Sequence, residues 1–192
     1  MDKLLEIVKL THSFTNVERT IYYPKSSRFE NDSEHSFQLA FIAWYLLSTN
    51  NFNLNSEKVF KLALSHDLVE VYAGDTFFYS DTSEQDKIDK EQKAADRLET
   101  EFPDFSEIHV NIHEYKNKSS NEAKFVYVLD KIIPILNIYL DEGRTWKEKK
   151  ITLKMLLEKK VDKIGIFPDL KLCFDEIVKV ITSNEKTLFH QK

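Results

Sequence analysis

The stretch Ser65-His66-Asp67-Leu68-Val69-Glu70, followed closely by Gly74-Asp75, places two strong metal-ligand types side by side in an apolar segment. Burying a histidine beside an aspartate is costly unless each side chain has a partner, and a divalent cation is the simplest partner for both. If the segment is helical, Glu70 shares a face with His66 and Asp67, which precede it by four and three residues. Taken alone, the His-Asp pair favours a hydrogen-bonded polar cluster in a core, so the rest of the chain must decide.

Length and composition predict one globular domain. The chain has 192 residues, of which 42% are hydrophobic and 31% charged, and this length is enough to bury a substantial core. We expect a single domain over residues 1–192, with its motif-bearing core at about 17–140. Further helices are expected at 145–183, followed by a polar tail at 184–192 that is free to move.

The scarcity of glycine and cysteine, together with the net charge, argues against several functional classes. The three glycines are isolated, so the chain has no Gly-rich phosphate loop and no dinucleotide fingerprint. The net charge of −5 argues against a groove for polymeric nucleic acid, which needs a basic face. Cys173 is the only cysteine, which excludes an intramolecular disulfide and a thiolate metal cluster and suits a reducing cytoplasm. Charges interrupt the apolar residues near the N-terminus, so neither a signal peptide nor a membrane span is expected there.

Two further apolar helices carry histidine or aspartate. Asn31 and Glu34 have the spacing of a capping box, which predicts a helix start with His35 in the first turn. The run that follows is almost wholly apolar, so we expect this helix to be buried on most sides. Asp130 lies on or beside the apolar face of a helix expected over Lys124 to Leu140, where an unpaired carboxylate is expensive.

The surroundings of Asp130 leave two interpretations open. Pro134 cannot donate to the carbonyl of residue 130, so the helix is expected to kink there, and a kink beside a buried acid suggests a site. The alternative is a simple bend in which Asp130 pairs with a lysine such as Lys131 or Lys124.

The rest of the chain also reads as helices and loops. Val59 to Tyr72 is expected to form one helix, and the region from Thr11 to Phe29 a helix end and a loop. No clear strand is predicted, so we expect an all-α bundle of roughly six to eight helices. His109 and His113 lie four residues apart on another expected helix, a spacing that can bind metal, but their charged neighbours favour a solvated face.

Four positions on three apolar segments therefore stand out: His35, His66, Asp67 and Asp130. Two imidazoles and two carboxylates suit a divalent ion that keeps open positions for water and substrate. Because no cysteine takes part, a structural zinc site is not expected.

Three blocks of sequence carry a resemblance to a known family over roughly Val17 to Asn137. They are Glu30-Asn-Asp-Ser-Glu-His-Ser, then Leu64-Ser-His-Asp-Leu-Val-Glu-Val-Tyr-Ala-Gly-Asp, then Glu122-Ala-Lys-Phe-Val-Tyr-Val-Leu-Asp-Lys. Together they resemble the H…HD…D pattern of the HD-domain phosphohydrolase superfamily. Within it, the chain looks most like the bacterial 5′-deoxynucleotidases of the YfbR type and the eukaryotic HD-domain-containing protein 2 group.

The resemblance implies a helical, metal-dependent phosphomonoesterase that acts on deoxyribonucleoside 5′-monophosphates and is commonly dimeric. Carried over to this sequence, Glu70 would position or deprotonate the attacking water, and Asp75 would assist proton transfer near the ester. Arg19 would bind the phosphate, although Arg28 also falls near the motif and stays an alternative. The implied metal ligands are His35, His66, Asp67 and Asp130.

The sequence also departs from the nucleotidases. After Gly74-Asp75 it reads Thr76-Phe77-Phe78-Tyr79, where they usually have a proline-containing loop, and this bears on substrate identity more than on chemistry. The metal is open among manganese, cobalt, magnesium, iron, nickel and zinc. We expect a homodimer that binds a nucleotide and neither polymeric nucleic acid nor a membrane.

Three other interpretations compete with the nucleotidase. One is a hydrolase of another small phosphoester or of an alarmone, but alarmone hydrolases carry a second acid where Val71 follows Glu70 here. Another is a non-catalytic HD module that binds a nucleotide for signalling, against which the intact Glu70 and Asp75 argue. The last is a polar core network without metal, which predicts little loss of stability with a chelator.

Overall fold

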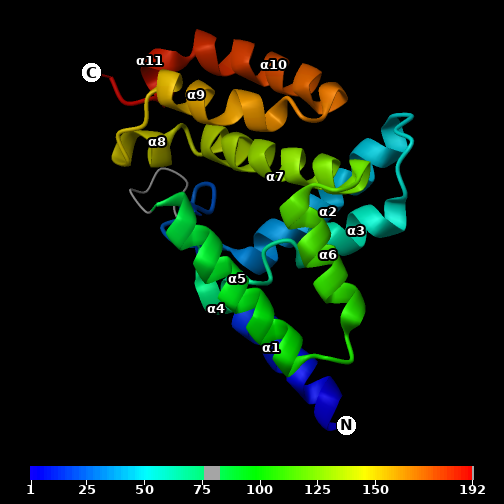
Figure 1. The fold of residues 1–192 in the computed structure, drawn as a ribbon. Helices are drawn as coiled ribbons and strands as arrows, with labels where there is room; N and C mark the ends of the chain where they lie inside the picture. Colours follow the sequence, from blue (N-terminus) through cyan, green and yellow to red (C-terminus); the bar gives the residue numbers. More distant parts are fainter. Residues whose placement is uncertain (76–82, 192) are drawn as a thin grey trace.

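The computed structural model describes residues 1–75 and 83–191, and most of them are helical (Figure 1). In these ranges eight helices have ten or more residues, so the predicted all-α class is confirmed. The long helices are α1 (Asp2–Thr15), α2 (Asp32–Thr49), α3 (Ser56–Ser65), α5 (Glu84–Glu101), α6 (Ser106–Asn117), α7 (Asn121–Leu140), α9 (Leu153–Ile164) and α10 (Pro168–Ser183). Short helices are α4 (Glu70–Ala73), α8 (Arg144–Glu148) and α11 (Glu185–Leu188).

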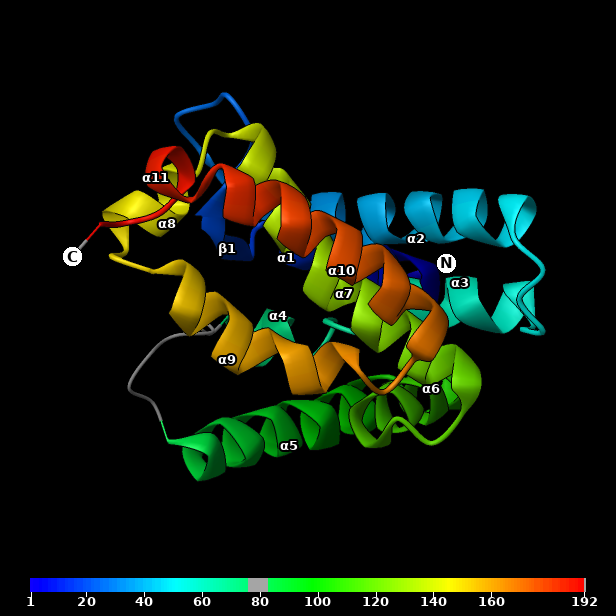
Figure 2. The same ribbon diagram turned by 90° about the horizontal axis from the view of Figure 1, so that it is seen from above.

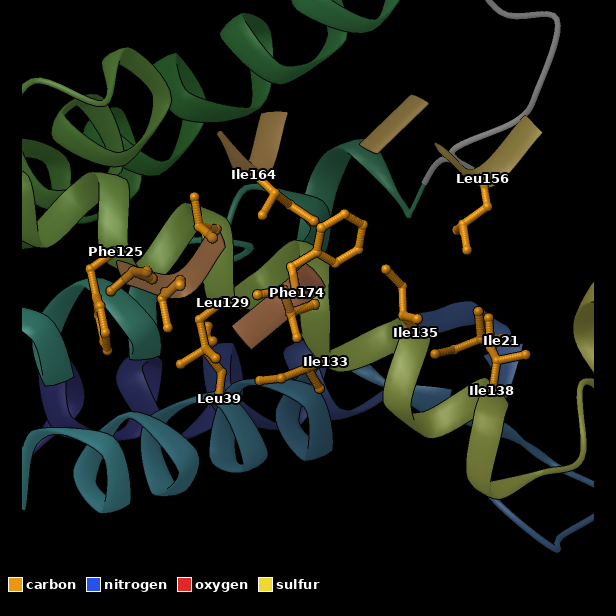
Figure 3. Packing of buried hydrophobic residues seen from close by; sticks show 14 of the residues in the cluster. Ile21, Leu39, Phe125, Leu129, Ile133, Ile135, Ile138, Leu156, Ile164 and Phe174 are labelled. Carbon is orange, nitrogen blue, oxygen red and sulfur yellow. The ribbon is translucent and has the colours of Figure 1, made fainter. Parts of the chain in front are cut away.

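The most apolar helix, α7, lies at the centre of the molecule. It packs against α2, α3 and α6 and also against α9 and α10, as Figures 1 and 2 show from two sides. Figure 3 shows the resulting core, in which Leu129 and Ile133 of α7 meet Leu39 of α2 and Phe174 of α10. Pro134 lies inside this helix, which continues to Leu140. Asp130 is therefore held in the most buried element of the fold.

The prediction that the chain has no strand was wrong. Strands β1 (Glu18–Tyr22) and β2 (Phe29–Asn31) form a two-stranded antiparallel sheet in which Tyr22 lies opposite Phe29. Their rings stack with centroids 4.6 Å apart. Pro24 and the paired serines indicated a loop, and they do form a turn, but strands this short leave little alternating pattern to read. The hairpin matters because β1 carries Arg19 to the start of α2.

The expected helix from Val59 to Tyr72 is also interrupted. Helix α3 ends at Ser65, His66 is its C-cap, and a turn leads into α4 at Glu70. The break follows from packing, because Leu68 and Val69 enter a second, smaller core. That core lies between α1, the turn, α5 and α6, with buried members Leu10, Phe14, Leu68, Val69, Ala94, Leu98 and Ile112. The His-Asp pair thus lies where the two cores meet.

The last part of the chain is more ordered than its composition suggests. The region from 145 splits into α8 and α9, and the expected polar tail at 184–192 begins with α11. Phe189 is 2% exposed and stacks on Trp146 with ring centroids 4.3 Å apart, so part of the expected polar tail packs against the rest of the fold. The burial of these two large rings explains why the segment is held.

Helix α2 was expected to be buried on most sides, and this was wrong for one face. Phe37, Phe41, Trp44 and Tyr45 are each more than half exposed. Their spacing places them along one stripe of the helix, and the rings of Phe37 and Phe41 stack with centroids 6.0 Å apart. No helix in the described ranges is long and apolar enough to cross a membrane.

Candidate metal and phosphoester site

His66 is fixed by the end of α3. Its Nδ1 lies 2.9 Å from the carbonyl oxygen of Ala63, and because a carbonyl only accepts, Nδ1 carries the proton in this hydrogen bond. The other ring nitrogen, Nε2, points to Asp67 and lies 3.0 Å from its Oδ2. Burial lowers the pKa of His66, but the carboxylates of Asp67 and Asp130 together outweigh burial and leave the pKa raised. This arrangement keeps Nε2 directed at the carboxylates, as metal ligation requires.

His35 and Asp130 meet across α2 and α7. His35 is fully buried, and its Nε2 lies 2.9 Å from Oδ1 of Asp130. The predicted capping box is present at the start of α2, with Asn31 accepting from the amide of Glu34, and it fixes the turn that carries His35. Burial, aided by the charge of Arg19, lowers the pKa of His35 to about 4, so the ring is neutral at pH 7 and able to act as a ligand.

Asp130 of α7 has three side-chain partners: His35, Tyr115 and Lys131. Besides His35, its other oxygen, Oδ2, accepts from the hydroxyl of Tyr115 at 2.7 Å and from Nζ of Lys131 at 2.6 Å. Burial acts to raise the pKa of Asp130, but Lys131 and His35 hold it well below the usual value. The lysine pair expected under the alternative interpretation is therefore present, yet Oδ1 still faces both histidines, at 2.9 and 3.9 Å.

The four predicted ligands come together. One ligand atom from each of His35, His66, Asp67 and Asp130 lies within 4.8 Å of the others. This set of two nitrogens and two oxygens fits a divalent transition ion or magnesium, and the His66 Nε2 is a buried atom without a hydrogen bond from the described residues. The residues therefore fit the metal ion that the sequence predicts.

Arg19 extends from β1 into the same cluster. Its Nη1 lies 2.8 Å from Oδ2 of Asp67 and 3.0 Å from Oδ1 of Asp32, while its Nε is 3.3 Å from Glu30. Burial acts to lower the pKa of Arg19, but the surrounding carboxylates, Asp67 first, leave it raised well above its usual value. The guanidinium is thus a permanent positive charge beside the predicted ligands.

Arg28, the other candidate for binding phosphate, lies elsewhere. Its guanidinium forms a fork with Glu34, at 2.5 and 2.7 Å, and is half exposed. Arg28 does not line the cavity that contains Arg19. The geometry therefore favours Arg19.

Glu70 lies at the first position of α4, next to Asp67 and Asp32, and the three carboxylates have oxygens within 4.8 Å of one another. Burial, and then the charges of Asp67 and Asp32, raise the pKa of Glu70 well above its usual value. Its Oε2 is buried without a hydrogen bond from the described residues. A carboxyl with a raised pKa beside a metal-ligand cluster has the character of a general base or acid.

Asp75 joins the site through the hairpin. Its Oδ2 accepts from the amide of Thr20 at 2.9 Å, and burial raises the pKa of its carboxyl. Asp75, Glu70 and Arg19 line one cavity together with Asp67 and Asp130. The cavity also has an apolar lining from α7, α8, α9 and the connection between α8 and α9, with Ile135, Ile138, Trp146, Ile151 and Leu156.

Sequence reasoning missed several residues of this site. Glu30 and Asp32 were quoted only as part of a motif, yet Asp32 is fully buried, and burial raises the pKa of each to about 7. The spacing of three residues between Asp32 and His35 on a helix could have placed them on one face. Tyr115 gave no such signal, because its contact with Asp130 depends on how α6 packs.

The second histidine pair does not form a metal site. His109 is buried and its Nε2 lies 2.9 Å from the carbonyl oxygen of Phe102, whereas His113 is exposed. The expectation of a solvated face holds for His113 and was wrong for His109, which instead ties α6 to the end of α5. Thr76 to Tyr79, where the sequence departs from the nucleotidases, lie outside the described residues.

Comparison with protein families identifies the fold of this site. The model of the HD domain matches residues 12–171, which include every predicted site residue. The chain is an HD-domain protein. The 5′-deoxynucleotidases HDDC2 of Xenopus laevis and Danio rerio are 32% and 31% identical to it, over 69% and 72% of this chain. The matched parts make up 66% and 70% of those relatives, so the chain aligns with about two thirds of their length.

The similarity to 5′-deoxynucleotidases extends to bacterial proteins. The 5′-deoxynucleotidase YfbR of Escherichia coli O1:K1 is 31% identical over 61% of this chain and 67% of its own length. The expected resemblance to both nucleotidase groups is therefore confirmed, and this HD protein is 5′-deoxynucleotidase-like over most of its length. A crystal structure of a predicted metal-dependent phosphohydrolase from Magnetospirillum magnetotacticum has a TM-score of 0.84 and 28% identity, covering 97% of this chain and 94% of its own.

Proposed function

We propose that this HD-domain protein is a metal-dependent phosphomonoesterase that releases phosphate from (deoxy)ribonucleoside 5′-monophosphates. One observation carries the proposal: four ligand atoms lie within 4.8 Å of one another, with Glu70 and Arg19 beside them. Relatives of about 30% identity are 5′-deoxynucleotidases, which supports the substrate class. The second candidate, another small phosphoester, shares this chemistry and differs only in what fills the apolar end of the cavity.

His35, His66, Asp67 and Asp130 would hold one divalent ion. When bound, the ion supplies Lewis-acid activation of water and neutralises charge that develops on the phosphoryl group. Arg19 is placed to bind the phosphate, because a guanidinium matches two phosphate oxygens with two parallel donors. Its present partners, Asp32 and Asp67, keep the fork oriented toward the cluster.

Glu70 and Asp75 divide the proton transfers. Glu70 takes the proton of the attacking water, for which its raised pKa is suited. Asp75, whose carboxyl also has a raised pKa, gives a proton to the ester oxygen that leaves with the nucleoside. Since the ester bond to phosphorus breaks as the water oxygen bonds to it, the products are a nucleoside and inorganic phosphate.

The proposal includes a cytoplasmic homodimer. The exposed stripe of Phe37, Phe41, Trp44 and Tyr45 on α2 supports a dimer, because a contiguous apolar patch of this kind is rare on a monomer. A two-fold contact along α2 would bury the stripe of each subunit on that of the other. The single cysteine, which is free and exposed, is consistent with a reducing compartment.

A panel of substrates tests the proposed activity. Chelator-treated protein would be supplied in turn with manganese, cobalt, magnesium or zinc and assayed for phosphate release from deoxy- and ribonucleoside 5′-monophosphates. We expect release with at least one metal and a preference among the nucleotides. If only other phosphoesters are cleaved, the second candidate is correct, and if metal binds without any cleavage, the catalytic proposal fails.

A further inference from the structure

A second opening also reaches the metal-ligand cluster. Its walls come from α5, α6, α7 and α9, and it includes His66, Asp67 and Glu70 but not Arg19. Five lysines line it, Lys87, Lys116, Lys118, Lys131 and Lys163, against three acidic residues, Asp67, Glu70 and Glu91. In a chain whose net charge is −5, this excess of positive charge beside the cluster is local and specific.

Two of these lysines share one aromatic ring. The Nζ of Lys118 lies 4.6 Å from the centroid of the Tyr127 ring, and the Nζ of Lys131 lies 5.1 Å from it. The two ammonium groups are therefore at most about 10 Å apart, roughly one Debye length at 0.1 M salt. An anion bound near both would be attracted by both ammonium groups, of which Lys131 also pairs with Asp130 and Lys118 also donates to the carbonyl oxygen of Lys116.

The backbone conformation of Lys118 is unusual for a lysine. Lys118 is the C-cap of α6 and has φ of 51° and ψ of 40°, in the left-handed region where glycine or asparagine is favoured. A lysine in this conformation costs stability, and here it places an ammonium over Tyr127. From the other side of the groove, α9 contributes Lys163, one turn after the buried Lys160 that lines the Arg19 cavity.

We propose that this lysine groove is a phosphate-binding site, separate from Arg19, in which Lys118, Lys131 and Lys163 hold a second anionic group. Lys131 lines both cavities and donates to Asp130, so it joins the groove to the predicted metal ligands. The ligand is a phosphate group, whether it is the second phosphate of a phosphorylated substrate or free inorganic phosphate. Binding of the anion does not depend on the proposed hydrolysis, whereas its assignment to a substrate does.

Calorimetric titration of metal-free protein with inorganic phosphate and pyrophosphate tests the site without requiring activity. Lys118→Asn removes the ammonium and suits the left-handed backbone, so this variant is expected to fold. We expect its affinity for pyrophosphate to fall about tenfold, as for the loss of one charge-assisted contact, with a similar fall for Lys163→Gln. Higher salt should weaken binding to the wild type.

Matched controls come from lysines outside the groove. Lys150 also has a positive φ, 56°, so Lys150→Asn repeats the same change at another position with a positive φ. Lys154 is an exposed lysine on α9 and serves as the control for Lys163. Neither control should change affinity more than twofold. Equal affinity in all variants, no binding of either anion, or a loss seen only in Arg19→Lys would each overturn the proposal.

Kinetics with metal-loaded protein then separate the two sources of the anion. If the groove holds a second phosphate of a substrate, Lys118→Asn raises KM for a nucleoside 5′-diphosphate more than for the monophosphate. If it holds the released product, the variant leaves both KM values unchanged and weakens inhibition by inorganic phosphate. Either result supports an anion site, because each requires the Lys118 ammonium.

Discussion

Glu30 is a buried carboxylate with only partial compensation for its charge. It accepts from the side-chain amide of Asn137 at 3.0 Å and lies 3.3 Å from Nε of Arg19. Burial nevertheless outweighs these partners and raises its pKa to about 7 from 4.5. The folded protein therefore binds this proton more tightly than the unfolded chain does, and stability from this group is lost as pH rises from about 4.5 to 7.

Replacing this carboxyl should remove that dependence on pH. In metal-free Glu30→Gln, we expect the free energy of unfolding to rise relative to that of the wild type as pH increases from about 4.5 to 7. The difference should grow by at most about 1.4 kcal/mol per pH unit. Urea unfolding of both proteins at several pH values measures the difference. Glu158→Gln, on the exposed face of α9, is the control and should follow the wild type. A wild type that becomes more stable relative to Glu30→Gln with rising pH would contradict the account.

The predicted ligands could be recognised at this scale because histidine and aspartate in apolar surroundings are rare without a partner. Glu30 and Asp32 were missed for the opposite reason. They stand beside a helix start, where acidic residues are common for capping and for the helix dipole, so their burial is not visible in the sequence. It arises when β1 brings Arg19 against the start of α2.

Elements were predicted best where a cap or an apolar stripe marks them. The capping box at Asn31 is present, and α7 ends at Leu140 as expected. The hairpin and the break after Ser65 were not predicted. Both depend on contacts between distant segments, the first with α2 and the second with the smaller core.

Gly143 fixes the turn between α7 and α8. Its φ is +74°, and a Cβ there would lie 2.0 Å from the backbone oxygen of Leu188 in α11. We expect Gly143→Ala to lower the free energy of unfolding by at least about 2 kcal/mol, from the strained φ and the displaced backbone together. Thermal unfolding followed by circular dichroism measures the loss.

Gly165 provides the matched control for this turn. It follows α9 with φ of −60°, and the nearest atom to a Cβ there is 3.4 Å away. Gly165→Ala should therefore leave stability unchanged or raise it by up to about 1 kcal/mol. Similar losses in both variants would show that α11 does not hold the turn at Gly143.

At the scale of the whole molecule, the fold class follows from few glycines and prolines and from long apolar stripes. The aromatic stripe of α2 stays exposed, because none of the described residues of the same chain covers it. We expect the wild type to be a dimer in solution and Phe41→Glu to be a monomer with unchanged helicity, because a buried charge would be unpaired at the contact. Light scattering after size exclusion measures both masses.

A control on another helix shows whether the effect belongs to the stripe. Leu172 is 69% exposed on α10, away from the aromatic residues of α2, and Leu172→Glu should stay dimeric. A monomeric wild type, or a Phe41→Glu protein of dimeric mass, would contradict the proposed contact.

The most direct test of the central claim measures metal content and phosphate release together in three proteins: wild type, His66→Ala and Glu70→Gln. We predict that the wild type binds one divalent ion and releases phosphate from nucleoside 5′-monophosphates. His66→Ala should lose both properties, while Glu70→Gln should keep the metal and lose a factor of about 10² to 10⁴ in rate. Phosphate release from chelated wild type, or undiminished metal content in His66→Ala, would contradict the assignment of this cluster as a catalytic metal site.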